Sequence, residues 1–237
     1  RLGEKPLYYG WQGAGNDRAF LFGSDLKAFK AYPNFNALVN RDSLCLFLRH
    51  NCIPSPHCIF EGFNKLDPGC YLNISMDQMS PKITRYWNAE SLVQNGVDNP
   101  LKGDFIEISR NLESKIIKAV NRQSISDVPL GTFLSGGIDS SVITALLQSQ
   151  SSKPVKTFTI GFEEEVYNEA IYAKNVAQHL GTEHTELYVS SQDSLDLIPE
   201  LPNIYGEPFA DSSQIPTFLL SELAKKDVTV VLSGDAG

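Results

Sequence analysis

The stretch FLSGGIDSS at positions 133–141 decides the fold of the second half of this chain of 237 residues. It follows the apolar run Val128–Leu134, passes through Gly136 and Gly137, and continues into Ser141–Gln150, where apolar residues recur with helical spacing. Adjacent glycines let a backbone turn tightly, because no β-carbon obstructs it. The stretch therefore predicts a buried strand that turns directly into a helix.

Strands and helices alternate on both sides of this turn. Apolar residues three and four apart predict a helix from Phe105 to Ala119, and Asp104 with Glu107 resembles a capping box at its start. Downstream, the pattern predicts strands at Val155–Ile160, Thr185–Val189 and Val228–Leu232, and helices at Asn168–Leu180, stopped by Gly181, and at Gln214–Lys226. Such alternation is typical of the α/β class, a doubly wound parallel sheet with helices on both faces.

Glycine follows three of the predicted strands, in the loops Ser135–Gly137, Gly161–Phe162 and Ser233–Asp235. Ligands of such sheets bind beyond the carboxyl ends of the strands, where the connecting loops converge. We therefore expect the three loops to line one crevice.

The first half of the chain has a different character. Residues 1–89 are rich in aromatics, glycine and proline, and turn-like clusters separate short apolar runs at Leu7–Trp11, Ala19–Phe22, Cys58–Phe60 and Tyr71–Ile74. This pattern predicts a mainly antiparallel β portion with few helices, so that the whole chain is α+β and then α/β. Asn88–Gly103 is polar with little periodicity. We therefore expect domains at 1–89 and 104–237, joined by a linker at 90–103.

The glycine turn suits an oxyanion. The first N–H groups of a helix have no partner within it, and the helix dipole adds positive charge there. The hydroxyls of Ser135, Ser140 and Ser141 can add donors. A carboxylate at Asp139 would repel a phosphate unless Mg²⁺ were shared between them, so a metal role is one interpretation. In the alternative, Asp139 or Ser140 merely caps the helix.

Composition narrows the classes of function. The net charge of −8, with no long basic run, argues against a broad nucleic-acid surface. No apolar run approaches the roughly 18–20 residues of a membrane span, and residues 1–10 do not read as a signal peptide, so we expect a cytoplasmic protein. Four cysteines lie between Cys45 and Cys70, but their irregular gaps of six, five and eleven residues favour free thiols over a zinc site.

Residues 135–141 resemble the pyrophosphate loop of the N-type ATP pyrophosphatases, which are adenine nucleotide alpha hydrolase-like. The loop is not a Walker A motif, because no Gly-Lys-[Ser/Thr] is present. Residues 205–213 and 232–235 resemble segments of the asparagine synthetase family. Residues 1–9, 23–27, 53–56, 65–69 and 86–87 are similar to the later part of a class II, N-terminal-nucleophile glutaminase domain. The resemblance covers nearly the whole chain.

The resemblance implies a glutamine-hydrolysing asparagine synthetase, a ligase that forms a C–N bond. Its partners would be ATP with Mg²⁺, aspartate and glutamine, without nucleic acid or membrane, and a homodimer is possible. It also implies an internal fragment that would be inactive alone. The cysteine nucleophile would precede Arg1, and an acidic metal ligand and a catalytic lysine would follow Gly237. The four cysteines present would not be that nucleophile.

Carried over residue by residue, the resemblance implies specific roles. Pyrophosphate and Mg²⁺ would be held by Ser135, Gly136, Gly137, Asp139 and Ser140, with Asp139 as the Mg²⁺ ligand. Leu134 and Ile160 would pack against adenine, Ser233 and Gly234 would contact the adenosine, and Asp235 would lie beside the reacting centre. Glu207 and Asp211 would position the amino acid or a metal, with a solvated acidic loop as the alternative.

Three residues depart from the family pattern, with Ala236 in place of glycine, Asn168 in place of aspartate and Asp25 in place of glutamate. Three rival functions also remain open. A related synthetase could close a lactam or amidate another carboxylate. A tRNA-modifying enzyme would share the loop, although the acidic charge and the glutaminase-like half speak against it. The chain could also be a degenerate module that binds a nucleotide without activity.

Overall fold

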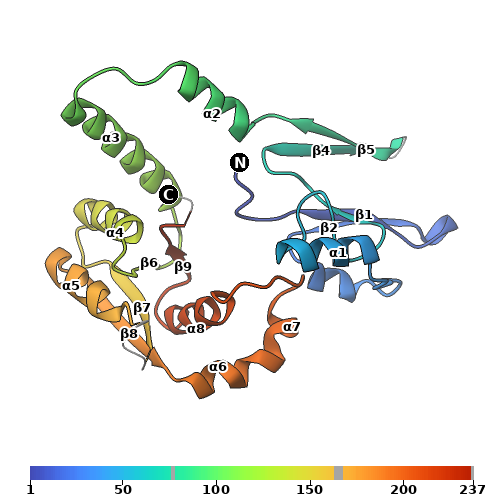
Figure 1. Ribbon diagram of the computed structural model, residues 1–237. Coiled ribbons are helices and arrows are strands. Elements are labelled where there is room, and N and C mark those ends of the chain that lie inside the picture. The colour runs from blue at the N-terminus through green and yellow to red at the C-terminus, as the bar shows by residue number, and fades with distance from the viewer. Residues whose placement is uncertain (76–77, 163–167, 236–237) are drawn as a thin grey trace. The chain divides into compact units, whose positions relative to one another are not determined.

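A computed structural model describes residues 1–75, 78–162 and 168–235. The chain divides into two compact units. Unit 1 comprises residues 1–100 and 199–211, and unit 2 comprises residues 101–198 and 212–237. Figure 1 shows the helices and strands of each unit.

Unit 1 contains antiparallel strands. The strands β1 (Tyr8–Gln12), β2 (Ala19–Gly23) and β3 (Phe63–Lys65) form a sheet in the order β2-β1-β3, and β4 (Cys70–Ser75) pairs with β5 (Gln78–Arg85). The described helices of this unit are α1 (Arg41–His50), α2 (Ala89–Asp98) and α7 (Leu201–Ile204), with 3-10 turns at Gly15–Asp17 and Leu26–Ala31. The antiparallel β portion predicted from the sequence is therefore confirmed.

The core of unit 1 gathers side chains from strands and from irregular segments. Its buried members are Tyr8, Leu26, Phe29, Ile53, Cys58, Ile59 and Phe63. The rings of Phe29 and Phe63 stack with their centroids 4.9 Å apart. Such a core explains why Cys58–Phe60 is apolar without being a strand, since Cys58 and Ile59 are buried and Phe60 makes only an isolated bridge to Val39. The prediction of a strand there was wrong.

The stretch interpreted as a linker contains a helix. Asn88 caps α2, because its side chain accepts a hydrogen bond from the N–H of Glu90. No residue of this helix is buried. Its formation rests on capping and backbone bonds more than on packing, which explains why apolar periodicity did not indicate it.

Unit 2 is built on a parallel sheet. Its strands are β6 (Leu130–Phe133), β7 (Lys156–Phe162), β8 (Glu183–Val189) and β9 (Val230–Leu232), in the order β8-β7-β6-β9 with every described pair parallel. The chain moves outward from β6 through β7 to β8 and then crosses to the other side of β6. This reversal beside β6 is the topological switch point at which doubly wound sheets bind ligands.

Helices cover both faces of this sheet. They are α3 (Phe105–Gln123), α4 (Ile138–Gln150), α5 (Ala170–Leu180) and α8 (Gln214–Ala224), while α6 (Ser191–Leu197) contacts α8. Figure 1 shows α4 and α5 on one side of the sheet and α8 on the other. Phe158 packs with Ala224 and Val228 on the α8 side, whereas Val120, Leu147 and Leu232 form a core with α3 and α4. The doubly wound α/β fold is confirmed.

The predicted helix boundaries agree closely with the structure. The carboxylate of Asp104 accepts a 2.8 Å hydrogen bond from the N–H of Glu107 at the start of α3. Gly181 ends α5 with a left-handed φ of 69°. Both are local signals, which is why the sequence alone predicted them.

Candidate nucleotide-binding site

The turn between β6 and α4 forms the centre of the candidate site. Gly136 has a φ of 81°, and a β-carbon there would lie 2.7 Å from both the N atom of Ala173 and the Cβ of Tyr172. Only glycine fits this backbone conformation without strain. Gly137 is the N-cap of α4 and supplies no side-chain cap, so the first N–H groups of the helix are not closed by their own cap residue.

Hydrogen bonds of serine hydroxyls stabilise the turn. The Oγ atoms of Ser135 and Ser140 lie 2.9 Å apart, the N–H of Ser135 donates to Ser140 Oγ at 3.2 Å, and the N–H of Gly137 donates to Ser135 Oγ at 3.3 Å. Ser140 is buried, and its hydroxyl also donates to the carbonyl of Gly137. Within the described residues, the Oγ of Ser141 is buried without a hydrogen-bond partner. Ser140 thus shapes the loop, and Ser141 retains a polar atom without a described partner.

The loop after β9 packs directly on this turn. A β-carbon at Gly234 would lie 2.6 Å from the N atom of Ser140 and 2.8 Å from the carbonyl carbon of Asp139. The hydroxyl of Ser233 bonds the carboxylate of Asp235 at 3.2 Å and accepts the N–H of Asp235 at 3.3 Å. Two loops separated by about a hundred residues along the chain therefore meet at the start of α4.

A cavity of about 520 Å³ opens where these loops converge. This volume lies within the range of ordinary small-molecule sites. Its lining includes most of the predicted site residues, namely Leu134, Ser135, Gly137, Asp139, Ser140, Ile160, Ser233, Gly234 and Asp235. Gly136 lies in the same turn, and Ser141 lies in the first turn of α4, directly after Ser140. The structure thus brings together the loops that the sequence expected in one crevice.

Other lining residues were not singled out from the sequence, namely Phe133, Thr159, Phe162, Glu169, Thr217 and Leu220. One signal could have found two of them. Thr217 and Leu220 are three apart on α8 and so share a helical face. Phe162 was expected in a loop with Gly161, but both residues belong to β7, so that loop prediction was wrong. Which face of α8 meets the cavity is set by its packing on β7, and a sequence does not state that.

The apolar side of the cavity carries the two residues predicted to meet adenine. Leu134 is 1% exposed and packs on Ala173 and Ala177 of α5. Ile160 lies in β7 and lines the same cavity. The site thus joins an apolar wall to a helix N-terminus.

Glu207 and Asp211 belong to unit 1, outside this cavity. The Glu207 side chain is 9% exposed, and its Oε2 lies 2.6 Å from Lys65 Nζ. Burial first, and then the nearby Glu207 carboxylate, raises the pKa of Tyr8 above its usual range. Asp211 is exposed. The structure therefore gives Glu207 protein partners in unit 1.

Across the described part of the chain, no group of three or more His, Cys, Asp and Glu side chains is arranged to hold a metal ion. Cys45, Cys52, Cys58 and Cys70 form no disulfide in the structure. Cys58 is buried, which raises its pKa to about 11. Asn168 accepts the N–H of Ala170 at the start of α5, and Ala236 lies outside the described residues.

Unit 2 is a Rossmann-like domain of the ATP-pyrophosphatase type. It has a parallel sheet with the strand order β8-β7-β6-β9, and β6 turns through Ser-Gly-Gly into a helix beside a cavity with an apolar wall. Comparison with known protein families agrees with this assignment of unit 2. The asparagine synthase family matches residues 111–237, and the glutamine amidotransferase domain family matches residues 1–87. The chain belongs to the asparagine synthase family.

Curated relatives extend the similarity over the whole chain. A Methanocaldococcus jannaschii protein, whose name assigns it provisionally to the glutamine-hydrolysing asparagine synthetases, is 37% identical over 100% of this chain and 44% of its own length. The Bacillus subtilis glutamine-hydrolysing asparagine synthetases 3 and 1 are 33% and 30% identical over 99% of this chain, and over 39% and 35% of their own lengths. The chain thus spans less than half of each of these relatives.

Across residues 1–75, 78–162 and 168–235, no helix is both long enough and apolar enough to cross a bilayer.

Proposed function

We propose that this chain is part of a glutamine-hydrolysing asparagine synthetase and that unit 2 carries its adenylation site. In the proposed reaction, the side-chain carboxylate of aspartate attacks the α-phosphate of ATP, and the bond to pyrophosphate breaks. Ammonia released from glutamine then attacks the acyl carbon, AMP leaves, and asparagine forms. The similarity of residues 1–87 to the glutamine amidotransferase domain supports glutamine as the ammonia source.

One observation carries the proposal. The uncapped start of α4, the glycine turn and the loop Ser233–Asp235 line one cavity together with apolar side chains. Backbone N–H groups at a helix N-terminus suit phosphate, and an apolar wall suits a purine. A nucleotide with its base against Leu134 and Ile160 and its phosphates at Gly136 and Gly137 would satisfy both halves of the cavity.

The side chains have distinct proposed roles. Ser140 keeps the turn in shape, because its hydroxyl is bonded within the loop. Gly234 permits the close approach of the second loop to α4. Asp235 lines the cavity, and its proposed role is to lie beside the reacting acyl group. Donors fixed before the reaction stabilise charge that builds on the phosphates without reorganising at that moment.

The residues also fit a divalent cation. Asp139 is exposed and lines the cavity, as does Asp235. Mg²⁺ is commonly held by one or two carboxylates together with substrate phosphates, so a protein cage of three ligands is not required. We propose Asp139 as the ligand, and the ion would offset the charge of the phosphates when bound.

The proposed setting is the cytoplasm. The four cysteines are free thiols, and Cys45 and Cys52 are exposed, which fits a reducing compartment.

Amino-acid-dependent exchange of pyrophosphate into ATP, measured on the protein at its natural length, tests the proposal. Exchange that appears with aspartate and not with glutamate supports adenylation of aspartate. Exchange with another carboxylic acid would point to a related synthetase, such as one that closes a lactam. ATP binding without exchange for any acid tested would point to a degenerate module and overturn the proposal.

A further inference from the structure

Residues 199–211, here called the strap, belong to unit 1, although the chain on both sides of them belongs to unit 2. The strap follows α6 and precedes α8. A segment of 13 residues therefore leaves one unit, becomes part of the other and returns. Specific contacts must therefore hold the strap against the rest of unit 1.

Backbone contacts fasten both ends of the strap. Near its start, Lys27 Nζ donates to the carbonyl of Ile204 at 2.6 Å and to that of Asn203 at 3.4 Å. Near its end, the N–H of Ala210 donates to the carbonyl of Asn51 at 2.7 Å. Between them, Gly206 lies against the carboxylate of Asp25, which a side chain on Gly206 would displace.

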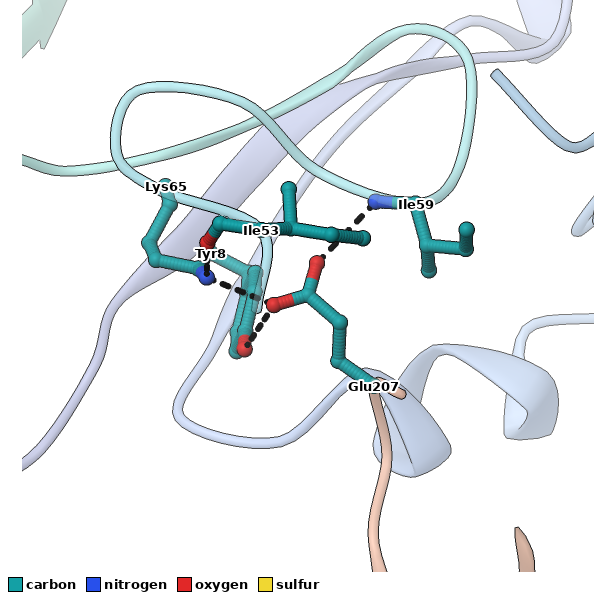
Figure 2. A network of polar contacts seen from close by, with 5 residues as sticks. All are labelled: Tyr8, Ile53, Ile59, Lys65 and Glu207. Carbon is teal, nitrogen blue, oxygen red and sulfur yellow. Dashed lines mark hydrogen bonds and ion pairs between the residues drawn. The ribbon is translucent and has the colours of Figure 1, made fainter. Parts of the chain in front are cut away.

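Glu207 holds the middle of the strap on unit 1. Figure 2 shows its carboxylate facing Tyr8, Lys65 and Ile59. Oε1 accepts the N–H of Ile59 at 3.0 Å, while Oε2 accepts the hydroxyl of Tyr8 at 3.1 Å and the ammonium of Lys65 at 2.6 Å. Lys65 also donates to the carbonyl of Ile53 at 2.7 Å.

This anchor is buried as well as bonded. The side chains of Glu207 and Lys65 are 9% and 16% exposed. A carboxylate held by three donors, one of them cationic, is already neutralised and satisfied. The Glu207 carboxylate therefore holds the strap on unit 1. To bind a substrate, as the resemblance implies, it would have to lose these hydrogen-bond partners.

The strap continues directly into the wall of the candidate site. Three residues, 211–213, separate Ala210 from α8, and Thr217 and Leu220 of α8 line the cavity. The far end of α8 is fixed in unit 2, where Leu220 and Ala224 pack with Phe158. The strap therefore joins the amidotransferase-like unit to a helix of the synthetase site through the chain itself.

We infer that Glu207 is a positioning residue whose anchor on Tyr8, Lys65 and Ile59 keeps ammonia release in unit 1 coupled to amidation in unit 2. This inference rests on the proposed function. If the strap detaches from the rest of unit 1, each unit retains its own site residues and core. Glutamine hydrolysis and asparagine formation should then both continue, but with weaker coupling between them.

The test uses the protein at its natural length and compares Glu207→Gln with Glu200→Gln. Glu200 is an exposed carboxylate of the same strap, bonded only to Asn203 among the contacts described, so it is a matched control. Glutamine consumed and asparagine formed are measured together, and asparagine synthesis is repeated with ammonium chloride in place of glutamine. For Glu207→Gln we expect the ratio of glutamine consumed to asparagine formed to rise about fivefold or more, the lower end of ordinary coupling. Ammonia-dependent synthesis should stay near that of the parent.

A second variant avoids the risk of a folding defect. Lys27→Met removes a half-buried contact of the strap and should raise the same ratio by a smaller factor. The double change Lys65→Met with Glu207→Gln leaves no unpaired buried charge but still lacks the ion pair, so it should fold more stably than Lys65→Met alone while its ratio stays above that of the parent. An unchanged ratio in Glu207→Gln, or an equal fall of ammonia-dependent and glutamine-dependent synthesis, would overturn the inference.

Failure of the proposed function itself is distinguishable. If the parent protein forms no asparagine from either nitrogen source, amide hydrogen exchange tests the anchor independently. Faster exchange of residues 199–211 in Glu207→Gln than in Glu200→Gln supports the anchor, and equal exchange in the two variants refutes it.

Discussion

Gly234 lies against the backbone of Ser140 so closely that a β-carbon on Gly234 would be 2.6 Å from the Ser140 nitrogen. Real β-carbons essentially never come this close to another heavy atom. The neighbour is backbone at the start of α4, which cannot rotate away as a side chain could. The contact therefore fixes the distance between the two loops that form the candidate site.

Gly234→Ala should remove nucleotide binding while leaving the fold largely intact. The added methyl group must push the loop after β9 away from α4, where the phosphates are proposed to bind. ATP affinity, measured by calorimetry, should fall at least about tenfold, which corresponds to about 1.4 kcal/mol. Gly96→Ala is the control, because no described atom lies within 4 Å of a β-carbon there. That change should leave ATP affinity unchanged and stabilise α2 by about 0.4–1 kcal/mol. Unaltered affinity in Gly234→Ala would contradict the proposed site.

Asp139→Asn should abolish adenylation and spare glutamine hydrolysis. The carboxylate is the proposed ligand of Mg²⁺, and an amide keeps its size but loses its charge. Aspartate-dependent pyrophosphate exchange should fall on the order of a hundredfold or more, the usual effect of removing a group that stabilises charge in the transition state. Asp127→Asn, an exposed site before β6, should have no effect. Equal loss of exchange and glutaminase activity in a folded Asp139 variant would argue against this role.

Single changes at the buried ion pair should destabilise unit 1. Lys65→Met leaves the Glu207 carboxylate buried without its cation, and such losses cost about 3–5 kcal/mol. Changing Glu207→Gln in the same chain should recover much of that loss, because no unpaired charge remains. Urea denaturation of the single and double variants measures both effects. Additive losses in the double variant would show that the two groups do not interact.

His184 should make unit 2 less stable at mildly acidic pH. Its Nδ1 lies 2.8 Å from Thr157 Oγ1, and its Nε2 is buried without a partner among the described residues. Burial lowers the pKa of His184, and the effect of Lys174 in the same direction is opposed by Glu186. The unfolded chain binds the proton near the ordinary pKa of about 6.5, while the folded chain binds it only at lower pH.

Stability from His184 is therefore fully present above about pH 6.5 and is lost as the pH falls toward its lowered pKa. The free energy of unfolding, measured between about pH 7 and 5, should decrease less in His184→Gln than in the parent protein. His179→Gln, an exposed site at the end of α5, should retain the parent slope. If the free energy of unfolding fell equally with pH in all three proteins, a contribution from His184 would be ruled out.

The hydroxyls of Thr132 and Thr144 should behave as a coupled pair. Both residues are fully buried, and their Oγ1 atoms lie 3.0 Å apart between β6 and α4. Thr144→Val leaves the Thr132 hydroxyl without this partner and should cost about 1–3 kcal/mol. Changing both residues to valine removes both polar groups and should cost less than the single change. Thermal unfolding of the three variants checks this order, and the opposite order would contradict it.

Local signals explain what could be predicted from the sequence. The Ser-Gly-Gly turn, the cap at Asp104 and the stop at Gly181 each depend on a few neighbouring residues, and the structure retains them. The alternation of apolar strands and amphipathic helices similarly implied a doubly wound sheet, whose geometry brings the loops after β6 and β9 together with the end of β7. The convergence of the glycine loops on one cavity was thus predictable, since topology alone places such loops at one edge of the sheet.

Tertiary structure decided what depends on contacts between distant residues. The sequence by itself determined the fold class and the loop that centres the site. It did not indicate that Thr217 and Leu220 face the cavity, because the packing of α8 on β7 selects that face. Nor could it place Glu207, since a buried carboxylate needs a cation, and Lys65 stands 142 positions away. That pairing exists only once residues 199–211 have folded onto unit 1.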